Sequence, residues 1–130
     1  MTDKTPIQRI SSHSAFEQQM AYCRVVADGH YVHVSGTTGF DYQSMTISND
    51  VAEQTEQCLL NIKNALDTAG ATLADVVRVN YILPNREDFE QCWPILKRYL
   101  GEHPPAATMI VAGLFDVRMK IEIEVTAVIG

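Results

Sequence analysis

The strictest pattern in this sequence is the alternation of residues 117–128, VRMKIEIEVTAV. Successive side chains of a strand point to opposite faces, so a period of two divides this segment into two sets. One face carries Val117, Met119, Ile121, Ile123, Val125 and Ala127, and the other carries Arg118, Lys120, Glu122, Glu124, Thr126 and Val128. This alternation predicts a strand with one face on the core. The chain must therefore build a sheet and cover it.

Part of that cover is predicted to come from a helix over residues 50–70. Apolar side chains recur there at steps of three and four, which gives one buried stripe. Asp50 is the predicted N-cap, and Glu53 stands at the spacing of a capping box. Gly70 is predicted to end the helix in a left-handed conformation.

A second helix is predicted over residues 86–100, and Pro94 leaves two alternatives for its geometry. An interior proline removes one hydrogen bond and clashes with the preceding turn. Either the helix kinks at Pro94, or its regular part begins close to that residue.

The remaining periodic segments predict strands over residues 22–28, 31–36, 75–83 and 106–112. The first two form a hairpin around Asp28-Gly29. Residues 37–49 are predicted to be a loop, and residues 1–12 a loose arm. The whole chain, residues 1–130, is therefore predicted to be a single α+β domain with the order β-β-α-β-α-β-β. Both helices are expected on one sheet face, and the other face needs cover because several strands are apolar on both sides. Oligomerisation supplies that cover most simply.

Charge and composition exclude several classes of function. The net charge of −6, without a stripe of Lys or Arg, argues against binding nucleic acid. No apolar run is long enough for a membrane helix, and the N-terminus has no apolar signal core, so we expect a cytoplasmic protein that does not bind membranes. Neither the cysteines nor the histidines have the spacing of a metal site, and no phosphate-binding loop is present, so no metal or cofactor is expected. The cysteines, expected to be buried and inert, are Cys23, Cys58 and Cys92.

Several segments resemble the RidA/YjgF (reactive-intermediate deaminase) family in order and separation. They are Tyr22, VSG at residues 34–36, EQTEQCLLNIKNALDTAGATLADVVRV at 53–79, HPPAATMIVAGL at 103–114 and IEIE at 121–124. The resemblance implies a chorismate-mutase-like (YjgF) fold with a mixed sheet and two helices on one face. It also implies homotrimers whose sheets line a central barrel and whose ligand clefts lie between subunits.

Family members of known chemistry hydrolyse enamines and imines derived from amino acids. The resemblance implies a small-molecule cleft built from Tyr22, Ser35, Gly36, Trp93, Ala107, Met109 and Glu122, with Glu122 beside the reactive water. The family's arginine in a P-A-R-[ST] motif binds the substrate carboxylate, but this chain has Ala107 at that position. Alanine offers no donor in place of a bidentate guanidinium. Trp93 and Met109 make the predicted cleft more apolar, and Thr37-Thr38-Gly39 stands where the family often has Gln-Ile-Pro.

Each of these residues also has a structural interpretation. Glu122 and Glu124 share a predicted strand face with Arg118 and Lys120, so both carboxylates fit exposed ion pairs. We expect a ligand role for Glu122 and a structural role for Glu124; burial in an apolar cleft would raise the pKa of Glu122, which suits acid–base chemistry. Tyr22 fits sheet packing, Ser35-Gly36 a strand end, and Trp93 a helix core. Three arginines, otherwise expected on the surface, are alternatives for the missing cation: Arg24, Arg78 and Arg118.

Two functions follow from the sequence. The first is a hydrolase or deaminase acting on a small imine, enamine or related carbonyl compound without a carboxylate, which the retained Glu122 favours. The second is a non-catalytic, metabolite-binding or regulatory trimer, which the lost arginine favours. An endoribonuclease, the activity attached to some relatives, is disfavoured by the negative charge.

Overall fold

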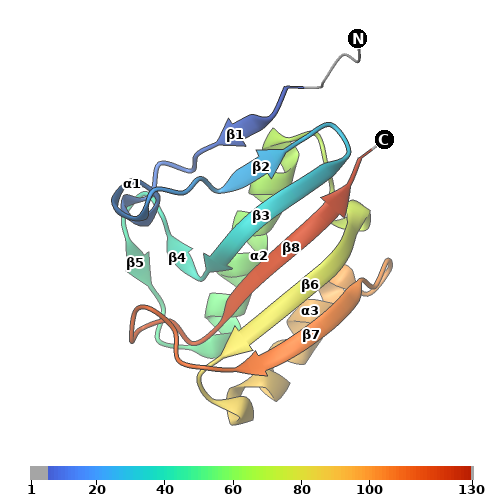
Figure 1. The fold of residues 1–130 in the computed structure, drawn as a ribbon. Helices are drawn as coiled ribbons and strands as arrows, with labels where there is room; N and C mark the ends of the chain where they lie inside the picture. The colour runs from blue at the N-terminus through green and yellow to red at the C-terminus, as the bar shows by residue number, and fades with distance from the viewer. Residues whose placement is uncertain (1–5, 130) are drawn as a thin grey trace.

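A computed structural model describes residues 6–129, and its centre is a six-stranded mixed sheet (Figure 1). The strand order is β1-β2-β3-β8-β6-β7, and all neighbours are antiparallel except β6 and β7, which are parallel. The strands are β1 (Gln8–Ile10), β2 (Val25–Ala27), β3 (Tyr31–Thr38), β6 (Val76–Leu83), β7 (Ala106–Val111) and β8 (Glu122–Val128). The predicted α+β class is confirmed.

Two helices, α2 (Val51–Thr68) and α3 (Trp93–Leu100), cover the same face of this sheet and leave the other face open (Figure 1). α3 crosses behind the sheet between the parallel strands β6 and β7, which need such a crossover. The smaller elements are α1 (Ala15–Met20), the hairpin β4 (Phe40–Asp41) and β5 (Thr46–Ile47), and the 3-10 turns η1 (Leu73–Asp75) and η2 (Arg86–Cys92).

The first long helix begins and ends as its sequence predicts. The Asp50 side chain accepts a hydrogen bond from the Glu53 amide, and Gly70 has a φ of 77°. Only half of the predicted capping box forms, because the Glu53 carboxylate accepts from the Ser48 hydroxyl instead of from the Asp50 amide. The buried stripe of α2, which packs on the sheet, includes Cys58, Leu59, Ile62 and Leu66.

The second helical segment changes type at Trp93. Residues 86–92 form the 3-10 turn η2, and the α-helix α3 starts at Trp93 with Pro94 in its first turn. A first-turn amide has no partner inside the helix, so proline loses nothing there. Of the two predicted alternatives, the one in which the regular helix begins near Pro94 is therefore confirmed.

Two segments that were predicted to be irregular contain regular structure. The arm predicted over residues 1–12 is wrong for residues 8–10, which pair with β2 as strand β1; residues 1–5 lie outside the described part of the chain. The loop predicted over residues 37–49 is also wrong, because β3 continues to Thr38 and a short hairpin, β4–β5, follows. Gly39 permits the close passage over α2, since a Cβ there would lie 2.5 Å from the Gln54 Cα.

The final strand is shorter than its alternation predicts. Only residues 122–128 form β8, and Val117, expected on the core face, is 98% exposed. Residues 113–120 form a connection instead, because the buried Gln54 side chain binds their backbone. Its amide nitrogen donates to the Arg118 carbonyl at 2.8 Å, and its oxygen accepts from the Lys120 amide at 2.8 Å. The alternation is correct from Ile121 onward, where every second side chain is buried.

Gln54→Leu is expected to lower the free energy of unfolding by about 3 kcal/mol or more, because it leaves the Arg118 and Ser48 carbonyls and the Lys120 amide without their partner. Urea denaturation measures the change. Gln57→Leu is the matched control on the same helix, since the Gln57 amide donates to Asn61 alone among residues 6–129. Equal losses in the two variants would contradict this account.

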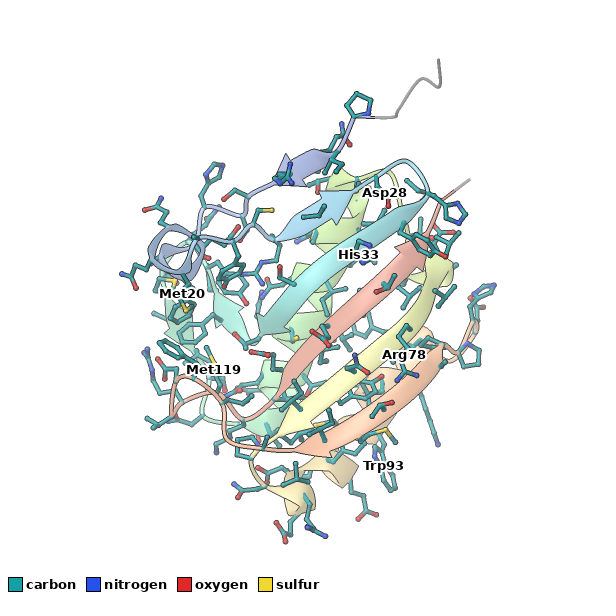
Figure 2. All side chains as sticks on the ribbon, in the orientation of Figure 1. Met20, Asp28, His33, Arg78, Trp93 and Met119 are labelled. Atoms are coloured by element: carbon teal, nitrogen blue, oxygen red, sulfur yellow. The ribbon has the colours of Figure 1, made fainter. Side chains whose placement is uncertain are left out.

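Three exposed apolar side chains follow one another on the edge strand β7. Met109, Ile110 and Val111 of β7 are 59%, 45% and 51% exposed. The middle of the open face is instead largely polar, with His33 and Arg78 lying on it (Figure 2). The expectation that the open face is broadly apolar is therefore wrong for its centre; of these three β7 residues, only Ile110 lies on that face, since Met109 and Val111 pair with Tyr81 and Leu83 on the helix side. None of the helices within residues 6–129 is long and apolar enough to cross a membrane.

Candidate functional site

Gly36 and Glu122 lie against each other where β3 meets β8. Val34 pairs with Val125 and Thr37 with Ile123, so Ser35 and Gly36 both stand opposite Glu124. This extra residue is a β-bulge, a feature that re-aims nearby side chains and is frequent beside active sites. A Cβ on Gly36 would lie 2.7 Å from Glu122 Oε2, so only glycine leaves enough space for the Glu122 carboxylate to pack here. The structure thus brings together two of the predicted site residues.

The Glu122 carboxylate is half-buried and unpartnered. Within residues 6–129 it forms no ion pair and no side-chain hydrogen bond. Burial raises the pKa of Glu122, the neighbouring Glu124 adds to the rise, and Arg24 opposes it. A carboxyl group in this state is available to accept a proton from a ligand or a water molecule.

Gly36→Ala is expected to displace the Glu122 carboxylate while changing the free energy of unfolding by no more than about 1 kcal/mol, because the methyl group meets the flexible end of a side chain. Release into solvent lowers the pKa of Glu122 toward its ordinary value. A carboxyl-carbon NMR titration measures this change. Gly113→Ala, where an added Cβ meets nothing within 4 Å, is the control. An unmoved Glu122 signal in Gly36→Ala would refute the contact.

Arg24 lies beneath this bulge and not on the surface, where it was predicted. It is 3% exposed, and its Nη1 donates to the Gly36 carbonyl at 2.8 Å and contacts Thr37 Oγ1 at 3.2 Å. The ring of Tyr42 stacks on the guanidinium, with its centroid 4.4 Å from Cζ. Arg24 is therefore committed to the backbone below the site and does not replace the missing cation in it.

A buried carboxylate balances this buried cation. Glu17 Oε2 lies 3.6 Å from Arg24 Nη2, and it accepts hydrogen bonds from the hydroxyls of Ser12 and Ser14. Burial acts to raise the pKa of Glu17, but the hydrogen bonds from Ser12 and Ser14 outweigh it and lower the pKa to about 2. Glu17 is ionised at every ordinary pH.

The Glu17 pKa predicts an acid-sensitive contribution to stability. Because the folded pKa is below the ordinary 4.5, this contribution is present above pH 4.5 and is lost as pH falls toward 2. It amounts to roughly 3 kcal/mol. Denaturant unfolding at pH 7 and pH 3 should show a smaller loss for Glu17→Gln than for the native chain. Parallel losses would contradict the assignment.

Tyr22 and Ser35 share a shallow hollow beside the bulge, lined also by Arg9, Cys23 and Val26. The Ser35 hydroxyl donates to the Cys23 carbonyl at 2.6 Å, which leaves its oxygen lone pairs to accept. Tyr22 is half-buried, and its ring centroid lies 5.6 Å from Arg24 Cζ. Glu122 does not line this hollow, although Gly36 connects the two places.

The other three predicted site residues lie elsewhere. Ala107 pairs with Val79 and Met109 with Tyr81, so both point to the helix side of the β7 edge, whereas Glu122 pairs with Ile82 on the open face. Trp93 is 47% exposed and packs edge-on against Phe89 beyond β7 (Figure 2). Within a single chain, Ala107, Met109 and Trp93 therefore do not lie beside Glu122.

Comparison with known proteins decides the family. Residues 12–129 match the family model described as endoribonuclease L-PSP. A Mycobacterium tuberculosis structure of the YjgF/YER057c/UK114 family is 34% identical and covers 95% of this chain and 100% of that one, with a TM-score of 0.86. The chain belongs to the YjgF/RidA family.

Two curated relatives extend this comparison. A RutC family protein of Pyrococcus abyssi is 32% identical over 107 residues, 82% of this chain and 84% of the relative. The human 2-iminobutanoate/2-iminopropanoate deaminase is 30% identical over 110 residues, 84% of this chain and 80% of the relative. The fold is accordingly the YjgF fold that the resemblance implied.

Two other arginines are alternatives for the cation that the YjgF/RidA family has at position 107. Neither Arg78 nor Arg118 reaches Glu122 within one chain. Arg78 lies four residues along β6 from Ile82, the partner of Glu122, which is about 13 Å at the rise of a strand. Arg118 is held by Asp116 at 2.8 Å. Glu124, expected to be structural, accepts from the Asn80 amide at 2.8 Å. In the described part of the chain, no group of three or more His, Cys, Asp or Glu side chains is arranged to hold a metal ion.

Glu17 and Gln54 shape this region but are not identified by sequence reasoning, and Arg24 was considered there only as a replacement for the missing cation. Ser14-Ala15-Phe16-Glu17 has the spacing of a capping box, which was the available signal for α1 and for Glu17. For Arg24 and Gln54 no local pattern exists, because they also bind residues far along the chain: the Gly36 carbonyl for Arg24 and the Arg118 carbonyl for Gln54. The predicted burial of the cysteines is right for Cys58 and Cys92, while Cys23 is half-buried; burial raises the pKa of Cys58 and Cys92.

Proposed function

We propose that this chain is a RidA-type hydrolase of small imines or enamines, in which Glu122 is the catalytic acid–base. The observation that carries the proposal is the half-buried, unpartnered Glu122 carboxylate beside the glycine bulge, with a raised pKa. A raised pKa brings a carboxyl group closer to neutral pH, where it exchanges protons most effectively. The name of the human relative, a deaminase of two imino acids, supports the reaction class.

The reaction requires one base and one acid in succession. Glu122, as carboxylate, takes a proton from water as the water oxygen bonds to the imine carbon and the C=N electron pair moves to nitrogen. The protonated Glu122 then returns a proton to that nitrogen. This gives a carbinolamine. Glu122 then takes the hydroxyl proton of the carbinolamine and delivers it to the nitrogen as the C–N bond breaks and the C–O bond becomes a carbonyl, so ammonia leaves and Glu122 is ionised again. An enamine substrate is first protonated at carbon, which gives the iminium ion, and this ion then follows the same steps.

We propose further that a homotrimer completes the ligand cleft. Ala107, Met109 and Trp93 sit at the exposed apolar β7 edge, where a second copy would bury them. A long, exposed, apolar edge strand is a liability unless another chain covers it. In the proposed cleft, one subunit supplies Glu122, Gly36, Ser35 and Tyr22, and its neighbour supplies the β7 edge.

The substrate range follows from Ala107. With alanine at the position of the family arginine, the cleft has no guanidinium there to bind a carboxylate. We therefore propose an altered range that excludes the usual amino-acid-derived imino acids in favour of imines without a carboxylate. The same feature supports the second candidate, a trimer that binds a metabolite without turning it over.

An endoribonuclease, the activity in the family model's description, fits the chain less well. Arg24 is buried under Glu17, and Arg98 and Arg118 are paired with Glu56 and Asp116. The net charge of −6 also makes the overall electrostatic field unfavourable for binding phosphates.

The test is ammonia release by the pure protein. The substrates are two short-lived imines made in situ by oxidation of an amino acid and of the matching amine, so that only the first carries a carboxylate. We expect release above the buffer rate, stronger for the imine without a carboxylate. No release from either, in a protein that light scattering shows to be trimeric, would reject the hydrolase in favour of the binding protein.

A further inference from the structure

We propose that Arg24 is a positioning residue for Glu122: its buried guanidinium holds the Ser35–Gly36 bulge in place and sets the electrostatic environment of the carboxylate above it. The inference rests on the proposed role of Glu122. It gives Arg24 a role in the site although the Arg24 side chain does not face the proposed ligand.

The hydrogen bonds of Arg24 reach both residues that follow Ser35. One nitrogen, Nη1, donates to the Gly36 carbonyl at 2.8 Å and lies 3.2 Å from Thr37 Oγ1. The Arg24 carbonyl also accepts from the Ser35 amide at 2.9 Å. A bulge interrupts the hydrogen-bond ladder of the sheet, so its peptide groups need other partners. Arg24 supplies such partners to Ser35 and Gly36.

Several side chains stabilise the buried Arg24 guanidinium. A lone guanidinium in an apolar interior is strongly unfavourable, and removal of its counter-charge destabilises a fold. Glu17 provides that counter-charge, and the hydroxyls of Ser12 and Ser14 hold Glu17. Tyr42 and Tyr22 place their rings 4.4 and 5.6 Å from the guanidinium carbon. A lysine would carry the charge but not the planar set of donors.

The charge of Arg24 acts on Glu122 from below the bulge. The ionisable groups that act on Glu122 are Glu124 on the same strand, Cys58 on α2 and Arg24. Glu124 raises the pKa of Glu122, and the Cys58 thiol is neutral at ordinary pH because burial raises its pKa. Among residues 6–129, Arg24 is the group that favours the ionised carboxylate. Arg24 thereby opposes the rise in the pKa of Glu122 that burial causes.

The test compares two paired substitutions. Glu17→Gln with Arg24→Gln removes the buried pair without leaving an uncompensated charge, and Glu56→Gln with Arg98→Gln removes an exposed pair joined at 2.8 Å. Carboxyl-carbon NMR follows the titration of Glu122 in each folded protein. We expect the first pair to raise the pKa of Glu122 by roughly one unit and the second to leave it unchanged. A shift below about 0.2 unit in the first pair would overturn the inference.

Arg24→Lys separates charge from geometry and serves if the paired variant does not fold. We expect a pKa of Glu122 close to native but amide exchange at Gly36 and Thr37 faster by about tenfold. Native exchange rates in this variant would overturn the positioning role. Because neither measurement uses a substrate, a missing ammonia release rejects only the proposed function, whereas an unmoved titration rejects only the role of Arg24.

Discussion

Glu122→Gln is expected to slow ammonia release by about 10²- to 10⁴-fold, the usual contribution of a general acid–base. Glutamine keeps the volume of the side chain and the contact with Gly36 but neither takes nor returns a proton. The assay is initial-rate ammonia release from the imine without a carboxylate.

This substitution should not unfold the protein. Because the folded pKa of Glu122 is raised, its favourable contribution is present below the ordinary pKa of 4.5 and is lost as pH rises through the folded value. A neutral side chain avoids that loss, so the free energy of unfolding at pH 7 should equal or exceed the native value.

Glu124→Gln is the matched control, since Glu124 lies two residues away on the same strand face and is bound by Asn80. We expect less than about fivefold loss of rate there, with the acid limb of the pH profile moved to lower pH because a repulsive neighbour is gone. Glu122→Gln with half of the native rate would exclude the catalytic role.

Ala107→Arg is expected to increase hydrolysis of the carboxylate-bearing imine by about 10- to 100-fold, the worth of a charged hydrogen-bond pair of roughly 1.5–3 kcal/mol. Ala107 is exposed on the β7 edge, so the larger side chain fits without disturbing the core. The rate for the imine without a carboxylate should not rise. The ratio of the two rates is the measurement.

Ala106→Arg is the control for this gain, because the neighbouring residue points to the opposite face of β7, beside Arg78. It adds the same charge to the same strand, outside the proposed cleft. Equal gains in the two variants would show a general effect of charge, and no gain at Ala107 would show that the cleft differs at further positions.

Local patterns determined most of the fold. The steps of three and four in residues 50–70, with Asp50 before them and Gly70 after, predicted α2 correctly, because each signal acts within a few residues. The alternation from Ile121 onward predicted the buried face of β8 for the same reason. The resemblance to the RidA/YjgF family then connected these elements into the correct sheet, which periodicity alone does not order.

The errors arose where tertiary contacts override local pattern. Residues 117–120 alternate like a strand, yet the Gln54 amide binds their backbone and keeps them out of the sheet. Residues 8–10 carry no strong strand pattern, but they pair with the free edge of β2. Such partners are distant in sequence, so no short window contains both sides of the interaction.

The sequence by itself determined that position 107 is an alanine, and its resemblance to the RidA/YjgF family implied one cleft built from Glu122, Gly36, Ser35, Tyr22, Trp93, Ala107 and Met109. Only the tertiary structure decided that Glu122 touches Gly36 across a bulge, that Arg24 is buried beneath it, and that Ala107, Met109 and Trp93 lie apart from it. The physical reason is that residue type and spacing record what a side chain can do, whereas burial, register and charge balance depend on which strands meet. Arg24 shows the difference most clearly. In the sequence, a charged side chain predicts exposure, and only the structure shows the buried Glu17 carboxylate that lies beside Arg24.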